Sequence, residues 1–104
     1  MMANELNLDF EWDVHKASSN AAKHGVTFEQ AATVWQDAFA LTVFDAVHSN
    51  FEDRWHTLGT TSAGNVLVVS HTFLSTSATH ARVRLISARP ATRNERNNYQ
   101  NEPR

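Results

Sequence analysis

The sequence contains no cysteine, which excludes a disulfide framework and any zinc or iron–sulfur site with thiolate ligands. Long apolar runs are also missing, since runs such as Val66–Val69 are far shorter than the ~20 residues that span a bilayer. Residues 1–10 carry no basic region followed by an apolar stretch, so no secretory signal is expected. These absences predict a cytoplasmic protein with no membrane segment.

Glycine and proline are scarce, with three and two residues, and charged residues make up 19% of the chain. Apolar residues make up 41% and include three Trp and six Phe, which is the composition of a folded chain and not of a disordered one. The length of 104 residues suits one hydrophobic core. We therefore expect a single domain over residues 1–104, with a core at 9–99 and frayed termini.

The net charge of −2 conceals an asymmetry between the two halves of the chain. Residues 1–53 carry nine acidic residues and two Lys, a charge of −7, whereas residues 54–104 carry seven Arg and two Glu, a charge of +5. A local basic surface of this kind is what a nucleic-acid-binding protein needs. Neutralisation of the basic half by the acidic half within the molecule is the alternative interpretation.

The periodicity of apolar residues predicts an α+β fold. Strands are expected at residues 9–12, 40–44, 54–61, 66–73 and 82–89, and helices at residues 14–24, 28–37 and 93–99. A Ser/Thr-rich, mobile loop is expected at residues 74–81. The resulting order, β-α-α-β-β-β-β-α, predicts two helices packed on one face of a largely antiparallel sheet.

Helix termini carry clear local signals. Asp13 is a suitable N-cap for the first helix, and Gly25 is suited to end it in the left-handed conformation. Thr27 precedes Gln30 by three residues, and Thr92 precedes Glu95 by three residues. Both pairs have the spacing of a capping box, so a helix is expected to begin after each Thr.

The segment 82–89 is rich in arginine and alternates as a strand does. Its period of two places Arg82 and Arg84 on one face and Arg89 on the other, with Val83 and Leu85. Arginine remains charged at any relevant pH and binds phosphate with two hydrogen bonds. The segment therefore favours binding of a phosphodiester, and a solvated, charged strand edge is the alternative.

Arg93 and Arg96 follow at helical spacing, so they share one helix face and extend the basic segment.

The six His residues lack the spacing of a helical metal site, so no metal is expected. His71 lies inside an expected strand, where a hydrogen-bonded core role competes with a catalytic one. Glu52 and Asp53 are adjacent, point apart in an extended chain and are interpreted as solubilising loop residues.

Several separated motifs occur in one order: residues 10–13 (FEWD), 23–31 (KHGVTFEQA) and 86–89 (ISAR), followed by Ala91, Thr92, Arg93, Glu95, Arg96 and Tyr99. In these the chain resembles the BrnT family of toxins over residues 9–99. The resemblance implies a RelE-like fold and a type II toxin that cleaves RNA and halts translation. It also implies a BrnA-like antitoxin with a ribbon-helix-helix part, whose complex with the toxin binds operator DNA, and it leaves open a homodimer within that complex.

Carried over by position, the resemblance implies functional roles for Lys23, Arg54, Arg84, Arg89 and Arg93. With the basic segment and the His residues, the expected catalytic residues are Arg54, His71, Arg84 and Arg89. The expected RNA-binding residues are Lys23, His24, Arg82, Arg93 and Arg96, and no cofactor is expected. The expected reaction is metal-independent attack of the RNA 2′-hydroxyl on the adjacent phosphate, which leaves a 2′,3′-cyclic phosphate.

The chain departs from the family pattern at three positions, where it has Val14, Pro90 and Asn94. The usual residue at the first position is Pro, and basic residues are frequent at the other two. Two missing positive charges weaken phosphate binding. They leave open a catalytically inactive binding module, which acts only as partner of the antitoxin and the operator in autoregulation.

Overall fold

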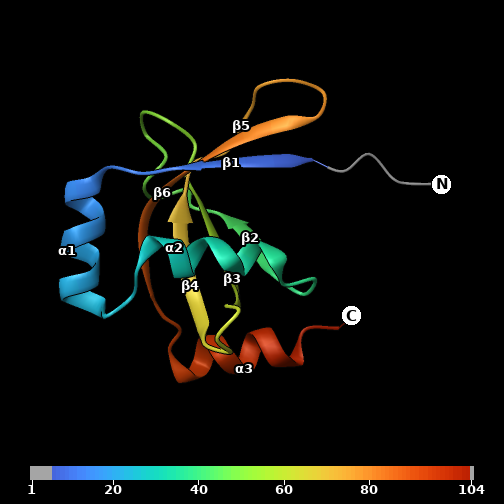
Figure 1. Ribbon diagram of the computed structural model, residues 1–104. Helices are drawn as coiled ribbons and strands as arrows, with labels where there is room; N and C mark the ends of the chain where they lie inside the picture. The colour runs from blue at the N-terminus through green and yellow to red at the C-terminus, as the bar shows by residue number, and fades with distance from the viewer. Residues whose placement is uncertain (1–5, 104) are drawn as a thin grey trace.

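A six-stranded sheet organises residues 6–103, the part of the chain that the computed structural model describes. The elements in chain order are β1 (Asn7–Glu11), α1 (Val14–His24), α2 (Phe28–Ala32), the 3₁₀ helix η1 (Thr33–Gln36), β2 (Leu41–Phe44), β3 (Trp55–Thr60), β4 (Val66–His71), β5 (Leu74–Ser75), β6 (His80–Pro90) and α3 (Arg93–Asn101). The α+β class predicted from the sequence is confirmed (Figure 1).

The strand order is β1-β6-β4-β3-β2, and β5 pairs with β6 beside this path. Strand β6 is long enough to have different neighbours along its length. Its first half pairs in parallel with β1 and its second half pairs antiparallel with β4. Strands β2, β3 and β4 form an antiparallel meander, so the sheet is largely antiparallel, as predicted.

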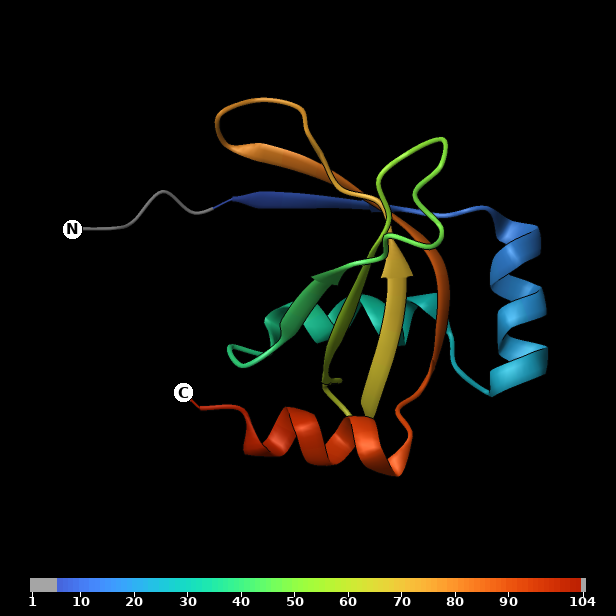
Figure 2. The same ribbon diagram turned by 180° about the vertical axis from the view of Figure 1, so that it is seen from behind.

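Helix α3 lies across one end of the sheet and α1 stands beside β6, while α2 lies on one face of the sheet (Figure 1). Phe28 and Val34 pack there against Val69 and Leu85 of the central strands, and all four are buried. From behind, strands β2, β3 and β4 stand in front of α2 (Figure 2). The loop of residues 45–54, which joins β2 to β3, lies at the end of the sheet opposite α3 (Figures 1 and 2).

The predicted helix caps are present, but at Thr27 the structure gives only the bond from the Gln30 N–H to the Thr27 hydroxyl, at 3.1 Å, and not the reciprocal capping box. Asp13 accepts a hydrogen bond from the backbone N–H of Lys16, and Gly25 ends α1 with a φ of 69°. Thr92 and Glu95 form a reciprocal capping box at the start of α3. The second α-helix ends at Ala32, earlier than predicted, and a 3₁₀ helix replaces its last turn. The Thr33 hydroxyl donates to the Gln30 carbonyl there, which competes with the backbone pattern.

The segment expected to be only a mobile loop, 74–81, contains β5 and the first residues of β6, so the predicted order lacks one strand. The early start of β6 depends on pairing with distant residues, since His80 pairs with Asn7, whereas β5 pairs locally with Ala81 and Arg82. Helix α3 continues to Asn101, so residues 100 and 101 are not frayed. Residues 1–5 and 104, also expected to be frayed, lie outside the described residues. Within residues 6–103, no helix is long and apolar enough to cross a membrane.

The expectation that Arg89 shares a face with Val83 and Leu85 is wrong. The register between β4 and β6 shifts by one residue, because Ser70 pairs with Ser87 while His71 pairs with Leu85. This bulge inserts one residue into β6 and reverses the alternation beyond it. The buried positions are therefore 81, 83 and 85 before the bulge and 88 after it. Arg89 falls on the partly exposed side, as Arg84 does.

A buried amide fixes α1 against β6. The Asn20 side chain donates to the carbonyls of Val26 and Ala88, at 3.0 and 2.9 Å, and accepts from the Ala88 N–H at 3.0 Å. These bonds satisfy the buried polar groups that would otherwise be unpaired. They also hold the last turn of α1, which carries Lys23 and His24, at a fixed place beside the sheet.

Candidate functional site

A cleft of about 330 Å³ lies between the 45–54 loop and the strands β1 and β6. Strand β6 contributes Arg82 and Arg84, the loop contributes Glu52 and Asp53, and β1 contributes Glu11. We call this site the arginine cleft. The parallel pairing of β1 with β6 places Glu11 beside Arg84, so the composition of the cleft follows from the sheet register.

Carboxylates contact each arginine of this cleft. Glu52 Oε1 accepts a hydrogen bond from Arg84 and lies 3.9 Å from Arg54 Nη2, while Glu11 Oε1 lies 3.6 Å from Arg82 Nε. The Arg84 and Glu52 side chains are still 41% and 42% exposed. Exposed ion pairs of this kind contribute ~0–1 kcal/mol to stability, so a phosphate group can displace them at small cost.

A buried carboxylate anchors the loop that carries Glu52. Asp45 Oδ2 lies 2.8 Å from His48 Nδ1 and 3.0 Å from His56 Nε2. Burial raises the pKa of Asp45, but hydrogen bonds from the His48 side chain and backbone and the charges of both histidines outweigh it, so the pKa is lowered. The carboxylate therefore stays ionised and joins the start of the loop to β3 through His56. The backbone N–H of Asp45 also donates to the Arg54 carbonyl, which holds the two ends of the loop together.

His71 lies in the core and not in the arginine cleft. It is 2% exposed, its Nδ1 donates to the Thr72 carbonyl at 3.0 Å, and its Nε2 lies 2.7 Å from the Thr57 hydroxyl. Burial lowers the pKa of His71 more than the Thr72 hydrogen bond raises it, and the charge of His56 lowers it further. This geometry favours the structural role that the sequence left open.

Arg89 joins α3 to the sheet. Its two terminal nitrogens donate to the two carboxylate oxygens of Glu95, at 2.8 and 2.9 Å. Hydrogen bonds from Arg89 lower the pKa of Glu95 to about 2, against the opposing effect of partial burial and with help from the Thr92 N–H. The same carboxylate thus completes the capping box of α3 and holds Arg89, away from the arginine cleft.

Replacing Glu95 with Gln is expected to make stability less dependent on acid pH. The folded-state pKa of Glu95 lies below its ordinary value of 4.5, so its ionised form stabilises the fold above that pH. This contribution is lost as the pH falls from about 5 to about 2. Gln retains the capping box. Melting temperatures should therefore fall less between pH 7 and pH 3 for the variant than for the parent, and equal falls would contradict the assignment.

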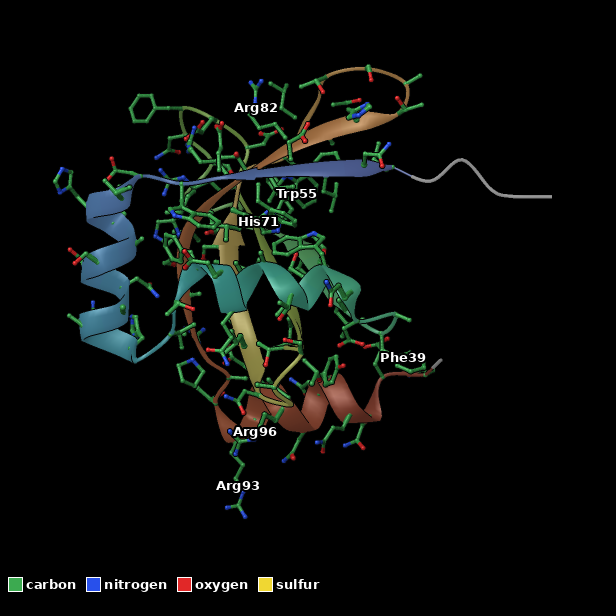
Figure 3. All side chains as sticks on the ribbon, viewed as in Figure 1. Phe39, Trp55, His71, Arg82, Arg93 and Arg96 are labelled. Carbon is green, nitrogen blue, oxygen red and sulfur yellow. The ribbon has the colours of Figure 1, made fainter. Side chains whose placement is uncertain are left out.

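The remaining predicted RNA-binding residues lie elsewhere. Lys23 and His24 border a groove of about 360 Å³ between α1 and β6. Arg96 donates to the Ala91 carbonyl at 2.9 Å, and Arg93 is exposed on α3. Figure 3 shows Arg93 and Arg96 at the opposite end of the molecule from Arg82. The structure therefore brings Arg54, Arg82 and Arg84 together and separates them from the other cations.

Sequence reasoning missed Glu52. The residue was interpreted as a solubilising loop residue, yet its carboxylate lies against Arg84, 32 positions further along the chain. No local sequence pattern could have predicted this contact, because the tertiary fold places the 45–54 loop next to β6.

Among the described residues 6–103, no group of three or more His, Asp or Glu side chains is arranged to hold a metal ion.

Comparison with known proteins identifies one family. The family model described as "Ribonuclease toxin, BrnT, of type II toxin-antitoxin system" matches residues 12–95. A crystal structure of the Brucella abortus ribonuclease toxin BrnT is similar in fold, with a TM-score of 0.57 and 18% sequence identity. The match covers 84% of this chain and 99% of that one. A search of curated proteins finds no match.

Proposed function

Because the chain belongs to the BrnT family of ribonuclease toxins of type II toxin–antitoxin systems, we propose that it cleaves RNA in the arginine cleft. The observation that supports this site most directly is the position of Glu52, which contacts Arg84 and lies 3.9 Å from Arg54. Arginines provide the charge that a phosphodiester needs, and a carboxylate beside them is a proton acceptor. In the proposed site, arginine and glutamate side chains supply both the phosphate-binding groups and the proton acceptor.

In the proposed reaction, Arg84 and Arg82 bind the scissile phosphate. Glu52 takes the proton of the neighbouring 2′-hydroxyl, and the 2′-oxygen forms a bond to phosphorus. The bond from phosphorus to the 5′-oxygen breaks, and that oxygen leaves with the electron pair and takes a proton from water. Glu52 then returns its proton to solvent. The products are a 2′,3′-cyclic phosphate and a free 5′-hydroxyl.

The arginines contribute most where negative charge develops. A guanidinium has five N–H donors, so Arg84 can keep one contact with Glu52 while its other donors face the phosphate. Donors placed at a developing oxyanion commonly contribute ~10²–10³ in rate. Since these charges are supplied by side chains, we propose that cleavage proceeds without a metal ion. Arg54 positions Glu52 in this scheme, and Arg89 and His71 have structural roles.

The second group of cations is proposed to bind flanking RNA. Lys23 and His24 line one groove, and Arg93 is exposed on α3, so all three side chains are accessible to a phosphate backbone. Such contacts strengthen binding without selecting a sequence.

We further propose that the protein acts in the cytoplasm and that its RNA cleavage halts translation. A BrnA-like antitoxin with a ribbon-helix-helix part would neutralise the toxin and carry the complex to operator DNA.

One observation favours a second candidate function. Each arginine of the cleft already faces a carboxylate, so the acidic half neutralises part of the basic half within the molecule. A chain with this charge balance could bind an antitoxin without cutting RNA. In that case the protein is an inactive BrnT-like module that acts in autoregulation.

An RNA cleavage assay in EDTA tests the proposal. Purified protein, free of antitoxin, should cut single-stranded RNA and leave 2′,3′-cyclic phosphate ends, which are identified by mass spectrometry. Cleavage that needs a divalent metal and leaves no cyclic phosphate would contradict the mechanism. A folded protein that binds its antitoxin but does not cut RNA would favour the second candidate.

A further inference from the structure

An aromatic pocket of about 240 Å³ lies next to the arginine cleft. Its walls are Trp35 of η1, Trp55 of β3 and Phe73, with Thr42 and His71. Figure 3 shows Trp55 and His71 on the same side of α2 as Arg82. Its volume is below the ~300–1,000 Å³ of pockets that hold whole drug-sized ligands, so it suits a single flat ring system.

The rings of this pocket are held in place by other rings. Trp35 packs edge-to-face on Phe10 and on His71, with centroid distances of 5.2 and 4.8 Å. Trp55 packs edge-to-face on Phe44 at 5.0 Å. Both Trp side chains are still partly exposed. The pocket is therefore preorganised, and a ligand would bind without having to order its walls.

The hydroxyl and imidazole groups at the pocket are already paired. The Thr42 and Thr57 hydroxyls lie 2.8 Å apart, and Thr57 in turn lies 2.7 Å from His71 Nε2. The other ring nitrogen of His71 contacts the Thr72 carbonyl. A ligand in this pocket would therefore meet ring faces and edges and few free hydrogen-bonding groups.

The pocket and the arginine cleft share one lining side chain. Phe73 lines both cavities, and the next residues on either side, Thr72 and Leu74, line the cleft. Phe73 is 43% exposed, so its ring is available to a ligand. An aromatic pocket beside a group of arginines is the combination that binds a base and its phosphate.

We propose that the aromatic pocket holds one nucleobase of an RNA strand whose phosphate lies in the arginine cleft. This inference depends on the proposed function, because it needs RNA in that cleft. Binding through ring faces requires an unstacked base, so the substrate is single-stranded RNA. Stacking tolerates every base, so the pocket selects weakly among the four.

The test compares two non-cleavable 2′-O-methyl oligoribonucleotides of equal length, one with bases and one abasic throughout. The oligomer with bases should quench tryptophan fluorescence and bind more tightly, and the abasic one should do neither. Replacing Phe73 with Ala should weaken binding of the first by about 5–150-fold, the effect of one stacked base, and leave the second unchanged. Phe39→Ala is the matched control, since Phe39 is 53% exposed and lies away from Trp55 in Figure 3.

The parent protein alone decides the main point, so the test does not depend on the Phe73 variant folding. Equal affinity for the two oligomers would overturn the inference, as would an unchanged affinity in a folded Phe73→Ala protein. If RNA is nevertheless cleaved in the EDTA assay, the proposed function stands without the base pocket. If neither oligomer binds and no RNA is cut, both proposals are wrong.

Discussion

Replacing Glu52 with Gln is expected to slow RNA cleavage by about 10²–10⁴-fold, the usual contribution of a general base. Binding of uncleaved RNA should become tighter at the same time. The variant removes one negative charge beside the phosphate, and two like charges ~4 Å apart in water-like surroundings repel each other by about 1 kcal/mol. Single-turnover cleavage and equilibrium binding, measured separately, would show a lower rate together with a lower Kd.

Asp53→Asn is the matched control for this variant. It removes the same charge from the same loop, but among residues 6–103 no arginine contacts Asp53. Its effect on the cleavage rate should stay within about fivefold, as for an exposed charge. A Glu52→Gln protein that cleaves RNA as fast as the parent, or faster, would show that Glu52 only masks Arg84.

Replacing Arg84 with Ala is expected to lower kcat by about 10²–10³-fold, because the variant loses a donor to the charge that develops on phosphorus oxygens. Arg84 is 41% exposed and its ion pair with Glu52 lies at the surface, so the fold should be preserved. Circular dichroism and thermal melting check the fold, and single-turnover cleavage measures the rate. Arg84→Lys should recover only part of the rate, since Lys lacks the planar fork.

Arg93→Ala distinguishes the two ends of the molecule. Arg93 lies at the end opposite Arg82, so its loss should weaken RNA binding and reduce its salt dependence with a smaller effect on kcat (Figure 3). A loss of kcat as large as that of Arg84→Ala would place the reaction at α3 and not in the arginine cleft.

The sequence by itself determined the features that depend on neighbouring residues. The capping residues Asp13 and Gly25 predicted the bounds of α1, and the caps at Asp13, Gly25 and Thr92 are where short side chains or a missing Cβ favour them. The motifs of residues 10–13, 23–31 and 86–89 also identified the family that the comparison supports. Such signals depend on residues close together in the sequence, so they can be identified without the tertiary structure.

Only the tertiary structure decided which charged residues meet. The bulge in β6 moved Arg89 to the other face and left it with Glu95, because strand alternation holds only while the register is unbroken. The return of the 45–54 loop placed Glu52 against Arg84, and no pattern within the loop encodes that approach. Contacts between residues distant in sequence depend on strand order and register, and these are set by the packing of the whole sheet.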